Sequence, residues 1–281
     1  MKRIFAIVLM SLMVMPAARS AQKTPSPIKV ISYNIRCGSM TDENDGTNSW
    51  KYRYPTSAMM IDDQKPDIFG LQEAKPDQMQ YMKEYCLGYK SVGVGRDDGK
   101  KQGENMAIFY NKKTVSLLKW GTFWLSETPD VPSKGWDSAC KRTATWAIMK
   151  HKASGKKFFY VNTHIDHRGV DGQRKGTELL AAKIKELNTE GYPVIVTGDF
   201  NMEPDNANIV AFGKEFYNAR KMASKTDDSF TYHGWGRAAE TIDYIWFKGF
   251  GSCTEYETIT KPYGGRNFIS DHYPVSAILF F

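Results

Sequence analysis

The stretch from Pro193 to Asn201, PVIVTGDFN, constrains the fold of this chain more than any other segment. Its β-branched run Val194–Val196 is short, uninterrupted and apolar, which predicts a strand covered on both faces. Gly198 interrupts the run, and Asp199 and Asn201 then follow where the strand leaves the core. An acid and an amide in this position commonly form a turn. By itself, the stretch leaves two interpretations open, a turn and a functional site at the end of a buried strand.

Four further stretches have the same organisation, an apolar run that ends in a polar residue able to bind a metal ion or a phosphate. They are Ser32–Arg36, Leu71–Glu73, Asn162–His164 and Ser270–His272. Together with Pro193–Asn201, and in this order, they resemble the endonuclease/exonuclease/phosphatase superfamily of metal-dependent hydrolases. The resemblance extends from about Ile28 to the C-terminus. It identifies a family and leaves the substrate open.

The resemblance implies an α/β fold, a four-layer α/β sandwich in which two mixed β-sheets pack face to face with helices outside. Alternation of strand-like and helical segments along the chain is compatible with this fold. The composition, 41% hydrophobic and 25% charged, is typical of globular proteins, and the chain has no internal linker or repeat. Residues 21–281 are therefore expected to form a single domain.

Apolar runs and helical spacing predict the individual elements. The expected strands are Ile28–Ile35, Ile68–Leu71, Gly103–Tyr110, Val115–Trp124, Ala144–Met149, Phe158–Thr163, the run from Val194, Thr241–Trp246 and Pro274–Phe280. The expected helices are Tyr54–Lys65, Gly172–Leu187 and Pro204–Phe212, and the expected loops are Gly38–Trp50 and Trp124–Trp136. We expect Gly103–Tyr110 to pair with Val115–Trp124.

The first 20 residues are typical of a secretory signal peptide. Lys2 and Arg3 precede the apolar stretch Ile4–Met15, and Ala18–Ser20 offers small residues at a cleavage point. The apolar stretch is shorter than the roughly 20 residues that a membrane span needs, although an uncleaved anchor is the alternative. We expect an exported protein, periplasmic or secreted, that is a monomer and is not stably inserted in a membrane.

The resemblance also implies roles for residues at the strand ends. Glu73 is expected to bind Mg²⁺ or Mn²⁺, together with Asn34 and Asp271. Hard cations of this kind prefer the oxygen ligands that these side chains offer. Asn34 and Arg142 are expected to contact the substrate phosphate, since a planar guanidinium suits phosphate oxygens.

Two imidazoles are expected to act in catalysis, each with a carboxylate behind it. The resemblance implies that His164 donates to a phosphate oxygen and that Glu104 hydrogen-bonds His164. Asp243 and His272 would form the second pair, an arrangement that fixes a tautomer and stabilises an imidazolium.

The polar residues that follow the central strand complete the expected catalytic set. Asp199 and Asn201 are expected to orient and activate the attacking water, or to steady the leaving group. Whether Asp199 or His272 takes the proton stays open at this point.

The resemblance thus implies an exported, Mg²⁺- or Mn²⁺-dependent phosphoric ester hydrolase in which water attacks a small phosphoester or a nonspecific phosphodiester. The alternatives are a nonspecific endo- or exonuclease and, less favoured, a noncatalytic binding protein on the same scaffold. The formal net charge of +7 includes Lys2, Arg3 and Arg19, so residues 21–281 carry +4. No extended basic stripe of the kind that duplex binding favours is present. A small phosphoester is therefore at least as well supported as DNA.

Four cysteines occur singly along the chain. They are Cys37, Cys86, Cys140 and Cys253. Without a C-x-x-C pair, a structural zinc site is not expected. Export permits disulfides, so the sequence leaves open whether these thiols pair.

Overall fold

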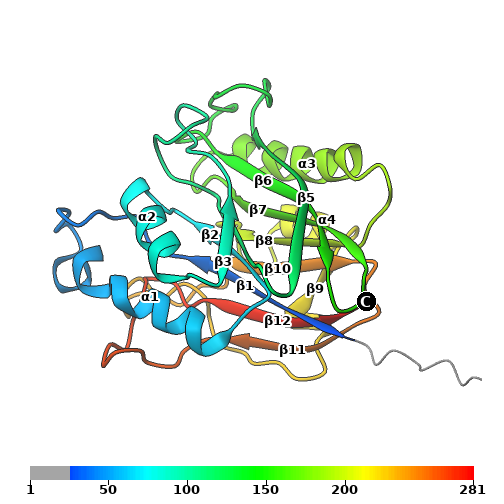
Figure 1. The fold of residues 1–281 in the computed structure, drawn as a ribbon. Helices are drawn as coiled ribbons and strands as arrows, with labels where there is room; N and C mark the ends of the chain where they lie inside the picture. Colours follow the sequence, from blue (N-terminus) through cyan, green and yellow to red (C-terminus); the bar gives the residue numbers. More distant parts are fainter. Residues whose placement is uncertain (1–25) are drawn as a thin grey trace, which may run out of the picture.

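Two six-stranded sheets pack face to face in the computed structural model, which describes residues 26–281 (Figure 1). The order of the first sheet is β11 (Ser252–Thr258), β12 (Val275–Phe280), β1 (Pro27–Asn34), β2 (Ile68–Gln72), β4 (Ile108–Asn111) and β3 (Tyr89–Val92). The order of the second is β5 (Val115–Trp124), β6 (Thr143–His151), β7 (Lys157–His164), β8 (Val194–Asp199), β10 (Asp243–Lys248) and β9 (Tyr217–Asn218). The predicted signal peptide, residues 1–20, lies outside the described residues.

Both sheets are mixed. The pairs β1–β2 and β7–β8 are parallel, and the remaining pairs are antiparallel. The two sheets thus share one plan, a central parallel pair flanked by antiparallel strands.

Helices cover the outer face of each sheet (Figure 1). The helices α1 (Trp50–Gln64) and α2 (Pro76–Tyr85) bury Met60, Ile61, Met79 and Met82 in a cluster with β1, β2 and β4. The helices α3 (Val170–Leu187) and α4 (Ala207–Phe212) pack on the second sheet. Two shorter elements are η1 (Gly46–Asn48) and α5 (Ala219–Met222). This arrangement confirms the predicted four-layer α/β sandwich.

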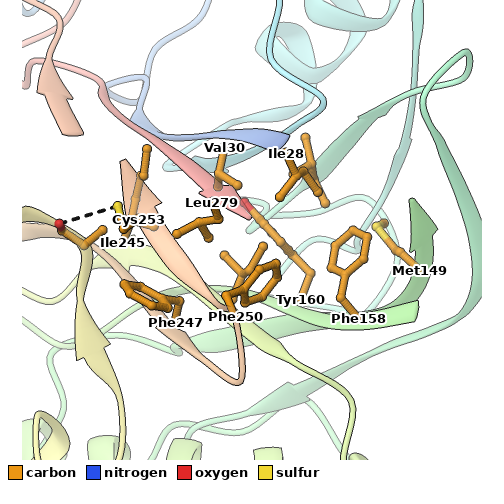
Figure 2. Close-up of a cluster of buried hydrophobic side chains, with 14 of the residues drawn as sticks. Ile28, Val30, Met149, Phe158, Tyr160, Ile245, Phe247, Phe250, Cys253 and Leu279 are labelled. Atoms are coloured by element: carbon orange, nitrogen blue, oxygen red, sulfur yellow. Dashed lines mark hydrogen bonds between the residues drawn. The ribbon is translucent and has the colours of Figure 1, made fainter. Parts of the chain in front are cut away.

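A central cluster of buried apolar side chains fills the space between the sheets, and Figure 2 shows part of it. Ile28 and Val30 of β1 belong to the same cluster as Phe158 and Tyr160 of β7. These side chains alternate along their strands, as expected for strands that bury one face against the facing sheet. Burial of this apolar area fixes how the strand ends of the two sheets are placed relative to each other.

A polar network interrupts this core directly below the strand ends. Asn162 of β7 is fully buried, and its amide donates to the backbone oxygens of Leu71 (2.7 Å) and Ala107 (3.1 Å) in the first sheet. The Asn162 oxygen in turn accepts from Gln72 (2.7 Å) and Thr197 (3.0 Å). Buried polar groups are tolerated where they are hydrogen-bonded. Asn162 therefore connects the two sheets by specific bonds.

Two sequence-based predictions about elements are wrong. The strand expected at Gly103–Tyr110 is reduced to β4, because Asn105 instead forms isolated bridges with Ala74 and Gly95. Strand β4 pairs with β2 and β3, whereas Val115–Trp124 pairs with β6 in the other sheet. The connection between them therefore crosses from one sheet to the other.

The first helix also begins earlier than predicted. It starts at Trp50, within the expected loop, and continues through Pro55. Trp50 is buried, and its ring packs edge-on against Tyr81 of α2 at a centroid distance of 5.7 Å. Packing of this ring on α2 extends the helix beyond what its polar flanking sequence indicates.

All four cysteines are free thiols, and two of them, Cys86 and Cys253, are buried. Among residues 26–281, no helix combines the length and the apolar character that a membrane crossing requires.

Candidate active site

Side chains from both sheets meet at one edge of the sandwich. Strands β1 and β2 run parallel and β12 runs opposite to β1, so the ends of β1 and β2 lie beside the start of β12. The same relation holds for β7, β8 and β10, in which Asp199 is the register partner of both His164 and Asp243. Strand direction therefore explains why residues far apart in sequence converge here.

A pocket of about 370 Å³ lies at this edge. Most of the predicted site residues line it, together with residues from the surrounding loops. The lining consists of Arg36, Cys37, Glu73, Arg96, Glu104, Cys140, Arg142, His164, His167, Asp199, Asn201, Tyr232, Glu240, Ile242, Asp271 and His272. Two predicted residues, Asn34 and Asp243, lie directly behind this lining and hydrogen-bond to it.

Asn34 joins the two sheets at the pocket floor. Its amide nitrogen donates to Glu73 Oε1 (3.1 Å) from the first sheet and to Asp199 Oδ2 (2.9 Å) from the second. Its oxygen accepts from the backbone N–H of Arg36 (3.0 Å), which identifies that atom as the oxygen. The expected neutral oxygen ligand for a metal therefore points away from the carboxylates. Asn34 instead holds the two carboxylates together.

Glu73 is held as a carboxylate. Besides Asn34, its Oε2 accepts from the backbone N–H of Cys37 (2.9 Å). Burial alone would raise the pKa of Glu73, but the positive charge of His272 and these two donors lower that pKa well below its ordinary value. Glu73 is therefore a negatively charged carboxylate at neutral pH.

His164 is neutral. Burial and the neighbouring Arg142 guanidinium lower the pKa of His164 well below its ordinary value. Asn201 donates through one amide nitrogen to Ile165 O (3.0 Å) and to His164 Nε2 (2.9 Å), so Nε2 is an acceptor and the proton is on Nδ1. His164 Nε2 also lies 3.4 Å from Asp199 Oδ2.

The expected Glu104–His164 hydrogen bond is absent. Glu104 instead forms an ion pair with Arg96 (2.5 Å), and His164 Nδ1 is buried without a hydrogen-bond partner among the described residues. Burial and the nearby Glu73 raise the pKa of Glu104. Arg96 lies within reach of Glu104 on the same loop, and this local pairing takes the carboxylate away from the imidazole.

The second carboxylate–imidazole pair is present. His272 Nδ1 and Asp243 Oδ2 lie 2.8 Å apart, and both residues are buried. Burial disfavours the charged imidazole, but the charge and hydrogen bond of Asp243 outweigh it and raise the pKa of His272 to about 10. His272 is therefore an imidazolium at neutral pH. Its Nε2 points toward Asp199, 3.8 Å from Oδ2.

Asp199 lies between the two imidazoles at the centre of the pocket. Burial and the Asp243 carboxylate raise the pKa of Asp199 to about 7. A carboxylate that titrates near neutral pH matches what a general base needs. Asp199 is the group in this pocket best placed to exchange a proton at physiological pH.

Arg142, directly before β6 of the second sheet, and Asp271, shortly before β12 of the first, both line the pocket walls. The Arg142 guanidinium is buried and contacts Asp166 (3.3 Å) and His167 Nδ1 (2.8 Å), which fix its orientation at the pocket wall. Asp271 Oδ2 lies 3.7 Å from Arg36 Nε, and burial raises the pKa of Asp271. A phosphate would meet a positive charge on each of these walls.

Three residues of the pocket lining have a left-handed backbone: Arg36 (φ 55°), Glu73 (φ 63°) and Asn201 (φ 51°). Residues other than glycine avoid this backbone conformation, and each residue that adopts it costs about 1–3 kcal/mol of folding free energy. Such strain persists where the surrounding structure fixes it, and it is concentrated at functional sites. The strand-end turns thus aim these three side chains into one space.

Two clusters of potential metal ligands occur in the described part of the chain, and they differ in charge. Glu73, His164 and Asp199 offer ligand atoms within 4.8 Å of one another, and the second cluster consists of Asp199, Asp243 and His272. The imidazolium of His272 would repel a cation at the second cluster. At the first, two carboxylates and a neutral imidazole face an open pocket, a donor set that fits a divalent cation such as Mg²⁺ or Mn²⁺.

Sequence reasoning did not anticipate several groups of the pocket wall. Arg96, Tyr232 and Glu240 belong to loops whose polar composition is typical of any solvated segment, so nothing in the sequence marks them. Arg36 ends one of the strand-end stretches, and its position two residues after Asn34 was a usable signal.

The comparisons with known proteins agree with this geometry. A family model described as "Endonuclease/Exonuclease/phosphatase family" matches residues 31–272. The solved structure of an endonuclease/exonuclease/phosphatase family protein from Bacteroides thetaiotaomicron is 35% identical, with a TM-score of 0.86, over 92% of this chain and 99% of that chain. The family match confirms the resemblance that the strand-end stretches indicate.

Two further relatives have names that state an activity. The structure of a mannosyl-6-phosphatase from Bacteroides thetaiotaomicron VPI-5482 is 36% identical, with a TM-score of 0.85, over 90% of this chain and 100% of that chain. The CCR4-Not complex 3'-5'-exoribonuclease subunit Ccr4 from Candida albicans is 24% identical over 72% of this chain, and the match spans 28% of that protein. The chain is therefore similar both to a phosphatase and to part of a nuclease.

Proposed function

Because the chain belongs to the endonuclease/exonuclease/phosphatase family, whose members are hydrolytic phosphoesterases, we propose that it hydrolyses a small phosphate ester in the presence of Mg²⁺ or Mn²⁺. A sugar phosphate monoester is the first candidate substrate. The observation that carries the proposal is the position of Asp199 between the imidazoles of His164 (3.4 Å) and His272 (3.8 Å).

Asp199 is the general base in this proposal. Its pKa of about 7 allows it to accept a proton, whereas His272, with a pKa of about 10, already holds one at neutral pH. The oxygen of a positioned water forms the new bond to phosphorus, and the water proton passes to Asp199. The ester P–O bond then breaks, and the proton that Asp199 accepted passes to the leaving alcohol, which regenerates the Asp199 carboxylate. The proposal thus assigns the proton to Asp199 and not to His272.

The positive groups of the pocket stabilise the phosphate. His272, kept charged by Asp243, lies on one side of Asp199, and Arg142 provides a guanidinium on the pocket wall. Groups that are fixed before the reaction stabilise developing charge without reorganising. Glu73 would hold the metal ion, and such an ion would neutralise charge on the phosphate.

Support for a sugar phosphate comes from the comparison and from size. The mannosyl-6-phosphatase is 36% identical over the whole of its solved chain. A pocket of about 370 Å³ lies in the lower part of the range of roughly 300–1,000 Å³ for small-molecule sites. We also propose that the protein is exported, on the signal-peptide pattern of residues 1–20 alone.

The experiment is a hydrolysis screen with purified protein, with and without EDTA. We expect mannose 6-phosphate or another sugar phosphate to be hydrolysed more efficiently than bis-p-nitrophenyl phosphate or plasmid DNA, and EDTA to abolish turnover until Mg²⁺ or Mn²⁺ is restored. Full turnover in excess EDTA would contradict the metal dependence. Absence of turnover with every phosphoester would contradict the proposed function.

A nonspecific nuclease is the second candidate, and the match to the exoribonuclease subunit supports it. DNA cleavage that exceeds the rate on every small ester, and that falls steeply as salt rises, would favour this candidate, because nucleic-acid binding releases counterions. Export is tested separately, by sequencing the N-terminus of the protein recovered outside the cytoplasm.

A further inference from the structure

A second cavity, of about 450 Å³, lies next to the catalytic pocket. We call it the lysine groove and define it by Pro76, Met79, Lys83, Lys100, Lys101 and Asn105. Helix α2 supplies the first three residues, and the loop between β3 and β4 supplies the others. None of these residues is part of the catalytic pocket.

The groove and the catalytic pocket share a wall that is one residue thick. Asn105 N donates to Ala74 O (2.8 Å) in an isolated bridge between the segment after β2 and the loop before β4. Glu73 and Glu104 line the catalytic pocket, and their chain neighbours Ala74 and Asn105 line the groove. A molecule held in the pocket therefore has the groove directly beside it.

The walls of the groove are positively charged. Lys83, Lys100 and Lys101 are exposed, and within residues 26–281 none of their ammonium groups makes a hydrogen bond or an ion pair. The acid on the wall, Glu84, accepts from Gln80 (2.9 Å). The ammonium groups are thus free to meet an anion.

The loop that carries two of these lysines is held in place. Gly95 N donates to Lys100 O (3.1 Å), and Asp97 N donates to Gln102 O (3.1 Å). From outside the loop, Lys141 Nζ donates to Asp97 O (2.7 Å) and Trp124 Nε1 donates to the preceding carbonyl, that of Arg96 (2.7 Å). A fixed loop presents its charges with little ordering cost on binding.

The floor of the groove is uncharged. Pro76 and Met79 provide apolar contact, and Asn105 is buried with a side-chain oxygen that has no hydrogen-bond partner among the described residues. The floor suits the carbon chain or sugar ring of a ligand.

We propose that the lysine groove binds a second anionic group of the substrate whose phosphate is hydrolysed in the catalytic pocket. This inference rests on the proposed function, and it specifies the substrate class as a small phosphoester that carries another phosphate or a carboxylate. Sugar bisphosphates and short phosphorylated nucleotides share this chemistry.

Binding of compounds that cannot be hydrolysed tests the groove without turnover. Isothermal titration calorimetry with Mg²⁺ compares butyl-, hexyl- and octylphosphonate with the alkane bisphosphonates of the same lengths. We expect at least one bisphosphonate to bind about tenfold more tightly than its monophosphonate, as several exposed charge pairs together would give. The triple variant K83A/K100A/K101A should lose this preference.

A matched control removes three exposed lysines elsewhere, in K150A/K185A/K214A, with the same change in net charge. We expect this control to keep the preference. Equal binding of each bisphosphonate and its monophosphonate by the wild type, retention of the preference by the groove variant, or its loss in the control would each overturn the inference.

Turnover identifies the source of the anion and separates the two proposals. The groove variant should keep kcat/KM for mannose 6-phosphate and lose about tenfold for either fructose 1,6-bisphosphate or 5'-phosphorylated dithymidylate. If hydrolysis of fructose 1,6-bisphosphate depends on the lysines, the substrate is a sugar phosphate. If hydrolysis of the dithymidylate depends on them, the substrate is a nucleotide. If no ester is hydrolysed but the calorimetric preference for bisphosphonates persists, the proposed function is wrong and the inference about the lysine groove holds. If esters are hydrolysed efficiently and neither turnover nor binding depends on the three lysines, the proposed function holds and the inference about the groove is wrong.

Discussion

His272 keeps its proton mainly because of the charge of Asp243 and the 2.8 Å hydrogen bond to it. The variant Asp243→Asn keeps the shape of this partner and removes its charge. Burial then meets less opposition, so we expect the pKa of His272 to fall below about 10, while the charges of Asp199 and Asp271 continue to raise it. NMR titration of the His272 ring measures this directly. We expect kcat to fall by about a hundredfold with it.

The same contact affects stability with a defined sign. The folded-state pKa of His272 is raised, so its stabilisation is complete below pH 6.5 and is lost as pH rises through about 10. The free energy of unfolding of the metal-free protein should decline across this window, and the decline should be smaller in Asp243→Asn. Asp228→Asn, the same change at an exposed residue, is the control. Equal pH slopes in all three proteins would refute the assignment.

Individual residues show where sequence reasoning stops. The Asp243–His272 pair follows from the resemblance and is present in the structure. The Glu104–His164 pair follows from the same resemblance and is absent, because Arg96 competes for Glu104. Nothing in the sequence marks Arg96. Which residue types gather at a site was predictable, but their partners depend on side-chain geometry that neighbouring loops decide.

At the scale of elements, strand β2 approaches the facing sheet at a glycine. A Cβ added at Gly70 would lie 2.3 Å from Asn162 Oδ1 and 2.5 Å from Thr197 Oγ1, atoms that hydrogen bonds hold in place. We expect Gly70→Ala to lower the free energy of unfolding by about 1–3 kcal/mol, measured by urea denaturation. Gly88→Ala, where an added Cβ meets nothing within 4 Å, is the control. Equal stability of the two variants would show that the sheets accommodate the methyl group.

Strands that carry site residues were predicted well, and so were the bounds of β5, but the partner of β5 was not. Buried runs such as Val194–Asp199 end abruptly in polar residues, which sets their boundaries within a residue or two. Strand β5 has an exposed middle section and a bulge between Leu117 and Lys119, so its apolar pattern does not reveal its partner. Pairing across sheets depends on the packing of the whole chain, and local periodicity does not contain it.

At the scale of the molecule, the proposed metal site lies where the two sheets meet, since Glu73 follows β2 and Asn34 links it to Asp199 at the end of β8. A cation bound at Glu73 should stabilise the folded state, by about 2.7 kcal/mol at one hundred times its dissociation constant. We expect Mg²⁺ to raise the unfolding temperature of the wild type, as measured by calorimetry. Glu73→Gln should abolish this rise. Glu104→Gln, which changes a carboxylate paired with Arg96, should keep the rise in unfolding temperature. If Glu104→Gln lost the rise and Glu73→Gln kept it, Glu104 and not Glu73 would be the metal ligand.

The pairing of β1 with β12 has a consequence for the order of events during synthesis. Strand β1 ends at Asn34, and its neighbour β12 begins at Val275, three residues after His272. A ribosome must make the chain at least as far as Val275 before these strands begin to meet, and pairings this distant in sequence form slowly. Until then Asn34 and Glu73 have no His272 opposite them. The proposed catalytic pocket is therefore complete only after β12 has joined β1.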